Sequence, residues 1–253
     1  MSDLPPPIPA ATLVLMRPAA DGPPQLLMTE RASHMAFAAG AYVFPGGRID
    51  PADHDTAAWL GETSADAAAR VAAIRETIEE TGIAPCVAPV LAADAIAAIR
   101  DGLGTGAPLH ELLDEHGARL DLAALTPFAR WCPNFKETRR FDTLFFLAAA
   151  PAGSAAALQV DAAEAVHAVW ITAADILGEI AAGRVAAIFP TRRNLERLAL
   201  FGSLDEAIAD AARHPVERIT PWVETRNGTP HLCIPEDAGY PVTSEPLATA
   251  RRS

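Results

Sequence analysis

Lysine, cysteine and aromatic residues are scarce in this sequence. Lys136 is the only lysine among 20 basic residues, a bias that suggests GC-rich bacterial coding. The 32 acidic residues outnumber the basic ones and give a formal net charge of −12. Such a surface repels phosphate backbones, which argues against a nucleic-acid polymer as partner. The three cysteines, Cys86, Cys132 and Cys233, are too far apart to predict a disulfide framework or a paired-cysteine metal site.

Long apolar runs are also missing. No stretch reaches the roughly 18 apolar residues that a membrane span requires. The N-terminal sequence MSDLPPPIPAATLVLM has no basic segment before its short apolar run, so it does not predict a signal peptide. We therefore expect no membrane partner, and the scattered cysteines favour a reducing, cytoplasmic location.

The composition itself is that of a packed globular protein, with 50% hydrophobic and 21% charged residues. Segments with strand character alternate with helical segments, which predicts the α/β class. We expect one domain over residues 1–253, with a helical insertion around 91–118 and a helical, proline-rich C-terminal extension from about 173. A division near residue 185 is the alternative organisation.

Individual elements follow from apolar periodicity and from glycine or proline at the boundaries. The predicted strands are Ala11–Met16, Gln25–Thr29, Ala41–Phe44, Ala124–Trp131, Thr143–Ala149, Ala165–Ile171, Val216–Ile219 and His231–Ile234. The predicted helices are a segment from Ser64 or Asp66 to Thr81, then Leu91–Leu103, Leu109–His116, Ala173–Ala182, Thr191–Phe201 and Leu204–Arg213. The polar segment Asp50–Gly61 is expected to be irregular.

Three carboxylates share one face of the helix that ends at Thr81. Glu76, Glu79 and Glu80 lie at i, i+3 and i+4, where their like charges repel one another. A hard divalent cation would neutralise that repulsion, and oxygen ligands favour Mg²⁺ or Mn²⁺ over zinc. A solvated acidic helix face is the alternative interpretation of these glutamates alone.

Gly47 and the segment Arg75–Ile83 resemble the sequence box of the Nudix hydrolases, G-x5-E-x7-R-E-U-x-E-E-x-G-U, where U is a bulky apolar residue. Thr77 stands at the first U position, and Asp53 stands where the box has its first glutamate. Asp53 and Arg75 are separated by 21 residues instead of seven, so the box contains an insertion. A surface excursion can absorb such a length change. Either Asp53 or Glu62 could fill the first acidic position.

The resemblance continues in the segment Arg139–Phe146, RRFDTLFF. One Nudix branch, which includes the peroxisomal coenzyme A diphosphatase, has a similar segment and an insertion inside its box. The stretches VFPGGRIDPAD and PEDAGYP fit this branch as well, so the resemblance covers most of the chain. It implies an α+β fold of the Nudix type, an α/β/α sandwich with a mixed sheet, plus additional helices.

The resemblance also implies roles for the residues of the box. Glu79 and Glu80 would be ligands of Mg²⁺, with Mn²⁺ as the alternative ion. Glu76 would hold a metal-bound water or a further ion, and the Gly47 carbonyl would complete the ligand set. Arg75 would pair with a neighbouring glutamate and fix the rotamers of that region.

Candidates outside the box concern proton transfer and phosphate binding. Glu137 and Glu76 are the alternatives for the general base. Arg139 and Arg140 could clamp substrate phosphates, because arginine forms bidentate contacts with oxygen, or they could be a charge pair at a strand edge. Arg31, at the end of a predicted strand, is a further phosphate candidate.

The resemblance implies a Mg²⁺-dependent hydrolase that cleaves a diphosphate bond in a nucleoside-diphosphate-linked substrate. Coenzyme A or acyl-CoA is the leading substrate, and ADP-ribose and dinucleotides are the alternatives. A catalytically silent nucleotide sensor with the same fold is the alternative of another class. The expected partners are the small nucleoside diphosphate derivative and a second copy of the chain. Trp131 and Phe135 are expected either to stack on an adenine or to lie in the core.

Overall fold

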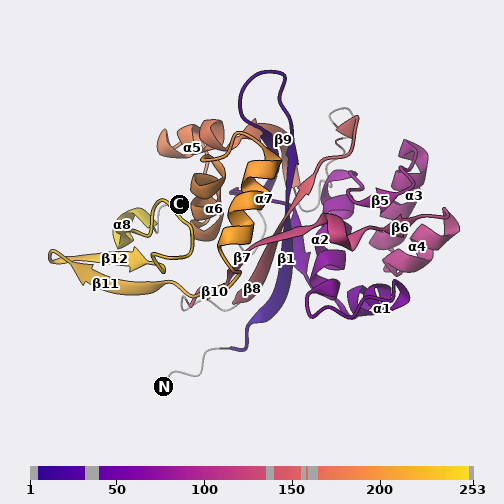
Figure 1. Ribbon diagram of the computed structural model, residues 1–253, viewed down its shortest axis with the longest axis horizontal. Helices are drawn as coiled ribbons and strands as arrows, with labels where there is room; N and C mark the ends of the chain where they lie inside the picture. Colours follow the sequence, from indigo (N-terminus) through magenta and orange to yellow (C-terminus); the bar gives the residue numbers. More distant parts are fainter. Residues whose placement is uncertain (1–4, 32–39, 135–139, 155–157, 159–164, 251–253) are drawn as a thin grey trace.

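The structure is a computed structural model that describes residues 5–31, 40–134, 140–154, 158 and 165–250. Within these residues, an eight-stranded mixed sheet carries helices on both faces (Figure 1). This arrangement confirms the predicted α/β class and the sandwich of layers. No helix in the described part of the chain is long and apolar enough to cross a membrane.

The main sheet is organised around β1 (Ile8–Arg17). Its strand order is β10-β7-β8-β1-β2-β3, while β4 pairs with β1 and β9 pairs with β2. β1 runs parallel to β8 and antiparallel to β2 and β4. The other strands are β2 (Gln25–Arg31), β3 (Tyr42–Val43), β4 (Gly46–Arg48), β7 (Thr126–Trp131), β8 (Phe141–Ala149), β9 (Ala165–Thr172) and β10 (Arg218–Ile219). The strands predicted for this sheet are confirmed, with ends shifted by a few residues, as is usual at boundaries.

The two faces of β1 belong to two separate hydrophobic cores. Leu13 and Leu15 lie in one core, whereas Val14 and Met16 lie in the other. Side chains alternate along a strand, so a continuous apolar run supplies both faces. The apolar sequence of β1 therefore reflects its burial between two helical layers.

The first core lies between the sheet and α2 (Ala67–Thr81). The helical insertion continues this layer (Figure 1). Its elements are β5 (Val87–Ala88), α3 (Ala93–Gly104), α4 (Leu109–Glu115), β6 (Arg119–Leu120) and the 3₁₀ turn η1 (Leu122–Ala124). The three helices predicted in this region are confirmed, whereas the short β5–β6 pair was not predicted.

The second core is covered by the C-terminal half of the chain (Figure 1). Its elements are α5 (Ala173–Ala181), α6 (Phe189–Leu198), α7 (Leu204–Arg213), β11 (Trp222–Arg226), β12 (Thr229–Cys233), β13 (Ser244–Pro246) and α8 (Leu247–Ala250). β11, β12 and β13 form a small separate sheet. Asn227 and Gly228, with φ of 50° and 77°, close the β11–β12 hairpin, as expected for an Asn-Gly turn.

One prediction in the N-terminal half is wrong: Asp50–Gly61 is not irregular, because Pro51–Trp59 forms helix α1. The segment begins with a capping box in which the Asp53 carboxylate accepts from the Asp50 backbone N–H at 2.8 Å. Pro51 occupies the first turn, where its missing N–H is not needed. The capping box and Pro51 mark the start of this helix without any apolar pattern, so apolar periodicity alone does not predict it.

The segment Gly46–Arg48, which forms β4, pairs with the same edge of β1 as β2 does. Ala10–Thr12 pair with β4, and Met16 and Arg17 pair with β2, while β8 occupies the other edge of β1. β2 therefore separates from the β1–β4 pair as it continues toward β3. This topology sets Gly46–Arg48 beside the middle of the sheet, on the side of α2.

Candidate active site

Helix α2, which carries the acidic residues, packs firmly against the first core. Val71, Ile74 and Ile78 are fully buried in the first core, as their spacing predicts. Gly82 ends the helix in the left-handed conformation, with φ of 68°, which only glycine adopts readily. The rotation of the helix is thus fixed, and so is the direction in which its carboxylates leave the backbone.

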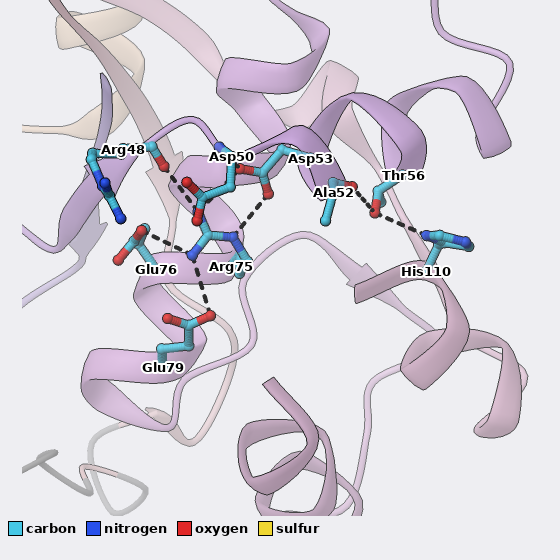
Figure 2. A network of polar contacts seen from close by, with 9 residues as sticks. All are labelled: Arg48, Asp50, Ala52, Asp53, Thr56, Arg75, Glu76, Glu79 and His110. Carbon is cyan, nitrogen blue, oxygen red and sulfur yellow. Dashed lines mark hydrogen bonds and ion pairs between the residues drawn. The ribbon is translucent and has the colours of Figure 1, made fainter. Parts of the chain in front are cut away.

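Arg75 stands at the centre of the polar network in Figure 2. Its Nε lies 2.8 Å from Asp53 Oδ1, and its Nη2 lies 3.0 Å from Asp53 Oδ2. Nη1 donates to Glu76 Oε1 at 2.9 Å and to Glu79 Oε1 at 3.2 Å. Nη2 also donates to the Arg48 carbonyl at 2.9 Å. One guanidinium therefore ties α1, the β4 loop and two glutamates of α2 together.

The electrostatics of Arg75 favour its charged form. Burial alone would lower the pKa of Arg75, but the hydrogen bond to Asp53 and the charges of Glu76, Asp53 and Glu79 raise that pKa above the ordinary arginine value. The predicted pairing of Arg75 with a neighbouring glutamate agrees with this geometry. Asp53 is its most extensive partner.

Asp53, rather than Glu62, contacts Arg75. The Asp53 residue is only 1% exposed and forms a bidentate pair, whereas Glu62 is exposed to solvent. Bidentate pairing with arginine is directional and charge-assisted. The inserted residues thus leave the Asp53–Arg75 pair in place, and Asp53 occupies the position that the sequence left open.

Gly47 allows a carboxylate to approach the backbone closely. A Cβ atom at this position would lie 2.3 Å from Glu76 Oε1, a distance that no side chain tolerates. The glycine is held by the β4–β1 ladder opposite Ala11, so it cannot move away. The Glu76 carboxylate therefore fills a space that every other residue type would occupy.

The remaining glutamates of the helix differ in exposure. Glu80 is 3% exposed, and its Oε2 lies 3.4 Å from the Thr29 hydroxyl of β2. The Glu79 side chain is 29% exposed. Buried carboxylates are costly unless they are paired or coordinate a metal. Carboxylate and backbone oxygens are also the donors that Mg²⁺ and Mn²⁺ prefer.

The residues therefore fit a hard divalent cation in donor type, since they offer carboxylate oxygens and a backbone carbonyl. Among the described residues, however, no three His, Cys, Asp or Glu side chains already form a ligand cluster. The physical reason is visible in the network: Glu76 and Glu79 both direct an oxygen at Arg75. The metal roles of Gly47, Glu76, Glu79 and Glu80 remain predictions.

The candidate phosphate residues are only partly described. Glu137 and Arg139 lie outside the described residues, as does Phe135. Arg140 precedes β8, and its Nη1 donates to Asn134 Oδ1 at 3.3 Å. Arg31 ends β2 at a bulge, where it is partly buried. The structure does not bring Arg31 or Arg140 into the network around Arg75, so their phosphate roles also remain predictions.

Trp131 belongs to the core rather than to a stacking site. It is 1% exposed, and its Nε1 donates to Tyr240 Oη at 3.0 Å and to Asn194 Oδ1 at 3.3 Å. Its ring meets Phe189 and Tyr240 edge to face. Of the two alternatives for Trp131, adenine stacking is therefore wrong and the core position is correct.

One contact of the site was not predicted. Arg100 of α3 donates from Nε to the Glu79 carbonyl at 2.7 Å. Arg100 lies in the insertion, where no motif marks it, and its partner is a backbone atom. Only the packing of α3 against α2 reveals it.

Comparisons with known proteins identify the family of the chain. No family model matches the sequence. The human acyl-coenzyme A diphosphatase NUDT19 is 27% identical over 275 residues, which cover 85% of this chain and 72% of the human protein. The crystal structure of a Nudix hydrolase from Alicyclobacillus acidocaldarius superposes with a TM-score of 0.69 at 31% identity, covering 81% of this chain and 96% of that one. The chain therefore belongs to the Nudix hydrolases, and it is similar to the branch that contains an acyl-coenzyme A diphosphatase.

Proposed function

We propose that this protein is a Mg²⁺-dependent hydrolase that cleaves the diphosphate bond of coenzyme A or an acyl-CoA. The observation that carries the metal-dependent part is the Arg75 network beside Gly47. It gathers Asp53, Glu76 and Glu79 around one guanidinium, next to a glycine that leaves room for a carboxylate. The arrangement joins both halves of the Nudix box in space despite their separation in sequence.

Glu76, Glu79 and Glu80 and the Gly47 carbonyl would hold the cation. When bound, Mg²⁺ supplies positive charge to the phosphoryl oxygens as negative charge develops on them. Arg75 holds Glu76 and Glu79 in defined rotamers, since Nη1 bonds to both. Asp53 in turn keeps Arg75 in place through its two oxygens.

The reaction adds water across the P–O–P linkage, so one phosphorus gains the oxygen of water and the other keeps the bridging oxygen. A general base must accept a proton from that water. Glu76 and Glu137 remain the two candidates, and Glu76 is the one within the described network. Arg139, Arg140 and Arg31 are proposed to contact the phosphates of the substrate.

The substrate proposal rests on the relative rather than on the geometry. The human protein at 27% identity is by name an acyl-coenzyme A diphosphatase. Cleavage of coenzyme A at its diphosphate would give 3′,5′-ADP and 4′-phosphopantetheine. ADP-ribose and dinucleotides contain the same linkage and are the competing substrates.

The test is to incubate the purified protein and Mg²⁺ or Mn²⁺ with CoA, acyl-CoA, ADP-ribose, NADH and diadenosine polyphosphates, and to identify products by mass. We expect 3′,5′-ADP from CoA, and a rate at least about 100-fold lower for Glu79→Gln and Glu80→Gln. Glu115→Gln is the matched control, because this exposed residue of α4 undergoes the same loss of charge and, within the described part of the chain, forms no hydrogen bond or ion pair with Arg75 or the glutamates of α2. Full activity in both site variants would contradict the metal assignment. Cleavage of ADP-ribose but not of CoA would replace the substrate.

We also propose that the protein acts in the cytoplasm as a homodimer. The three cysteines are free, which suits a reducing compartment. Trp222 and Val223 of β11 are 43% and 56% exposed, and exposed apolar surface of this kind favours association. Light scattering should give twice the 26.6 kDa of one chain. A monomeric mass at micromolar concentration would contradict the dimer.

A further inference from the structure

The last turn of α2 ends in backbone carbonyls that can accept hydrogen bonds from outside the helix. The final four carbonyls of a helix lack intrahelical donors. Gly82 N donates to the Ile78 carbonyl at 2.9 Å, which closes the preceding position. The next amide, Ile83 N, donates to the Thr81 hydroxyl at 3.2 Å. The Glu79 carbonyl is thus among the terminal carbonyls of the helix that can accept from a donor on another element.

Arg100 supplies that donor. Its Nε lies 2.7 Å from the Glu79 carbonyl oxygen, a short charge-assisted hydrogen bond. Arg100 is carried by α3, which is anchored in the first core by Ile99 and Leu103. The donor thus comes from a packed helix rather than from a loop, and its position is fixed.

The charge of Arg100 also suits its place. The carboxyl end of a helix is its negative pole, and a cation there is stabilising. α2 has no basic residue in its own last turn, yet that turn carries Glu79 and Glu80. The insertion therefore provides, from another helix, the positive charge that the sequence of α2 lacks at this end.

We propose that Arg100 is a positioning residue of the active site: by holding the Glu79 carbonyl, it fixes the turn from which Glu79 and Glu80 reach the cation. This inference rests on the proposed metal-dependent function. It gives the insertion at α3–α4 a role in metal binding, although the insertion itself supplies no metal ligand. Loss of the bond would let the last turn of α2 fray and spread the two carboxylates over several orientations.

The test measures metal affinity directly, in the absence of substrate. Mn²⁺ is titrated into the full-length protein, and free Mn²⁺ is followed by its electron paramagnetic resonance signal. Arg100→Met keeps the apolar stem of the side chain but removes the donor and the charge. We expect its Kd for Mn²⁺ to rise about 10-fold or more, as for other residues that orient metal ligands. Arg100→Lys keeps the charge and should lose less.

Arg70→Met is the matched control, because Arg70 belongs to α2 itself. Arg70 also clamps α2 to a backbone carbonyl, since its Nη1 donates to Leu122 O at 2.8 Å, but it lies in the first half of the helix. We expect it to lower the melting temperature while changing the Mn²⁺ affinity less than about 2-fold. This comparison separates positioning of the carboxylates from general stability.

The outcomes distinguish the two proposals. An unchanged Mn²⁺ affinity in Arg100→Met, or an equal loss in Arg70→Met, would overturn the role of Arg100 and leave the proposed function intact. A parent protein that binds no Mn²⁺ would overturn the metal assignment, and the role of Arg100 with it. A weaker affinity confined to the Arg100 variants would support the inference, even if the substrate differs from CoA.

Discussion

At the scale of single residues, the site depends on one arginine and on one missing side chain. Arg75 forms hydrogen bonds to four residues, and the two glutamates among them take their orientation from it. Gly47 matters because it has no side chain: a methyl group at this position would overlap the Glu76 carboxylate. Both features can be tested with single substitutions.

Asp53→Asn should destabilise the protein by about 3 kcal/mol. The substitution removes one partner of a buried ion pair and leaves the Arg75 charge only partly compensated. Unfolding in urea measures the change. Glu62→Gln, an exposed site, should change the free energy of unfolding by less than about 0.5 kcal/mol. The reverse order of the two losses would assign the paired position to Glu62.

Gly47→Ala should leave the fold intact but displace the Glu76 side chain. The new Cβ forces Glu76 to rotate away and to lose its 2.9 Å contact with Arg75. We expect a loss of Mn²⁺ affinity of about 10-fold or more in the metal titration. The control is Gly178→Ala in α5, where a Cβ meets no atom within 4 Å and where alanine favours the helix. Parent-like Mn²⁺ affinity in Gly47→Ala would show that the close approach has no role in metal binding.

At the scale of elements, the sequence predicts helices well where packing and capping agree. α7 appears at its predicted bounds, Leu204–Arg213, and α2 ends at Thr81 because Gly82 follows. α1 was missed because its nine residues show no apolar helical periodicity, and its beginning is marked by a capping box of two aspartates. The short strands β4, β5, β6, β11 and β13 were missed for a related reason: their pairing partners, rather than their own composition, make them strands.

The features of the candidate site also fall into those that the sequence predicts and those that it does not. Helical spacing alone predicts that Glu76, Glu79 and Glu80 lie on one face of α2, whereas their joint binding of a metal remains a prediction. The choice between Asp53 and Glu62 needed the fold, because the inserted residues hide which acid returns to Arg75. The bond from Arg100 to a backbone carbonyl leaves no trace in a sequence pattern. The relative positions of residues within one helix can be predicted from the sequence, whereas contacts between segments that are far apart in the sequence cannot.

The C-terminal extension is joined to the sheet through Tyr240. Its hydroxyl donates to Asn194 at 2.7 Å and accepts from Trp131 at 3.0 Å. Burial raises the pKa of Tyr240 to about 12, against the opposing effects of Arg197 and of the hydrogen bonds. The unfolded chain therefore loses this proton near pH 10, before the folded protein does. The stability that Tyr240 contributes is present below pH 10 and is lost between pH 10 and about 12.

Raising the pH from 8 to 11 should thus destabilise the parent by about 1.4 kcal/mol more than it destabilises Tyr240→Phe, because one pKa unit corresponds to that energy. Phenylalanine cannot ionise, so the variant has a lower but flatter stability profile in this range. Urea unfolding at both pH values gives the comparison. If the free energy of unfolding fell equally with pH in the two proteins, the ionisation of Tyr240 would not be coupled to unfolding.

At the scale of the whole molecule, one sheet links the two cores. Met16 of β1, Met28 of β2 and Phe128 of β7 all face the C-terminal helices. A chain that ended near residue 185 would leave this apolar face in water. This arrangement favours a single domain over a division near residue 185, and the single domain remains a prediction.

We therefore expect one cooperative unfolding transition. Calorimetry should show a single peak whose calorimetric and van't Hoff enthalpies agree. The fluorescence of Trp59, beside α4, reports unfolding on one side of the sheet, and that of Trp131, in the second core, reports unfolding on the other. Variants that keep only one of these two fluorophores should therefore give coincident unfolding midpoints. Two separated transitions would favour independent units that divide near residue 185.

The Asp53–Arg75 pair joins the two halves of the box through space, so the length of the chain between them matters little. Extending a closed loop from 7 to the present 21 residues costs only about 1 kcal/mol of closure entropy. Residues 61–64 of this loop are exposed throughout. They offer a position for new chain ends or for an inserted reporter domain, placed next to the catalytic machinery yet outside its network of contacts.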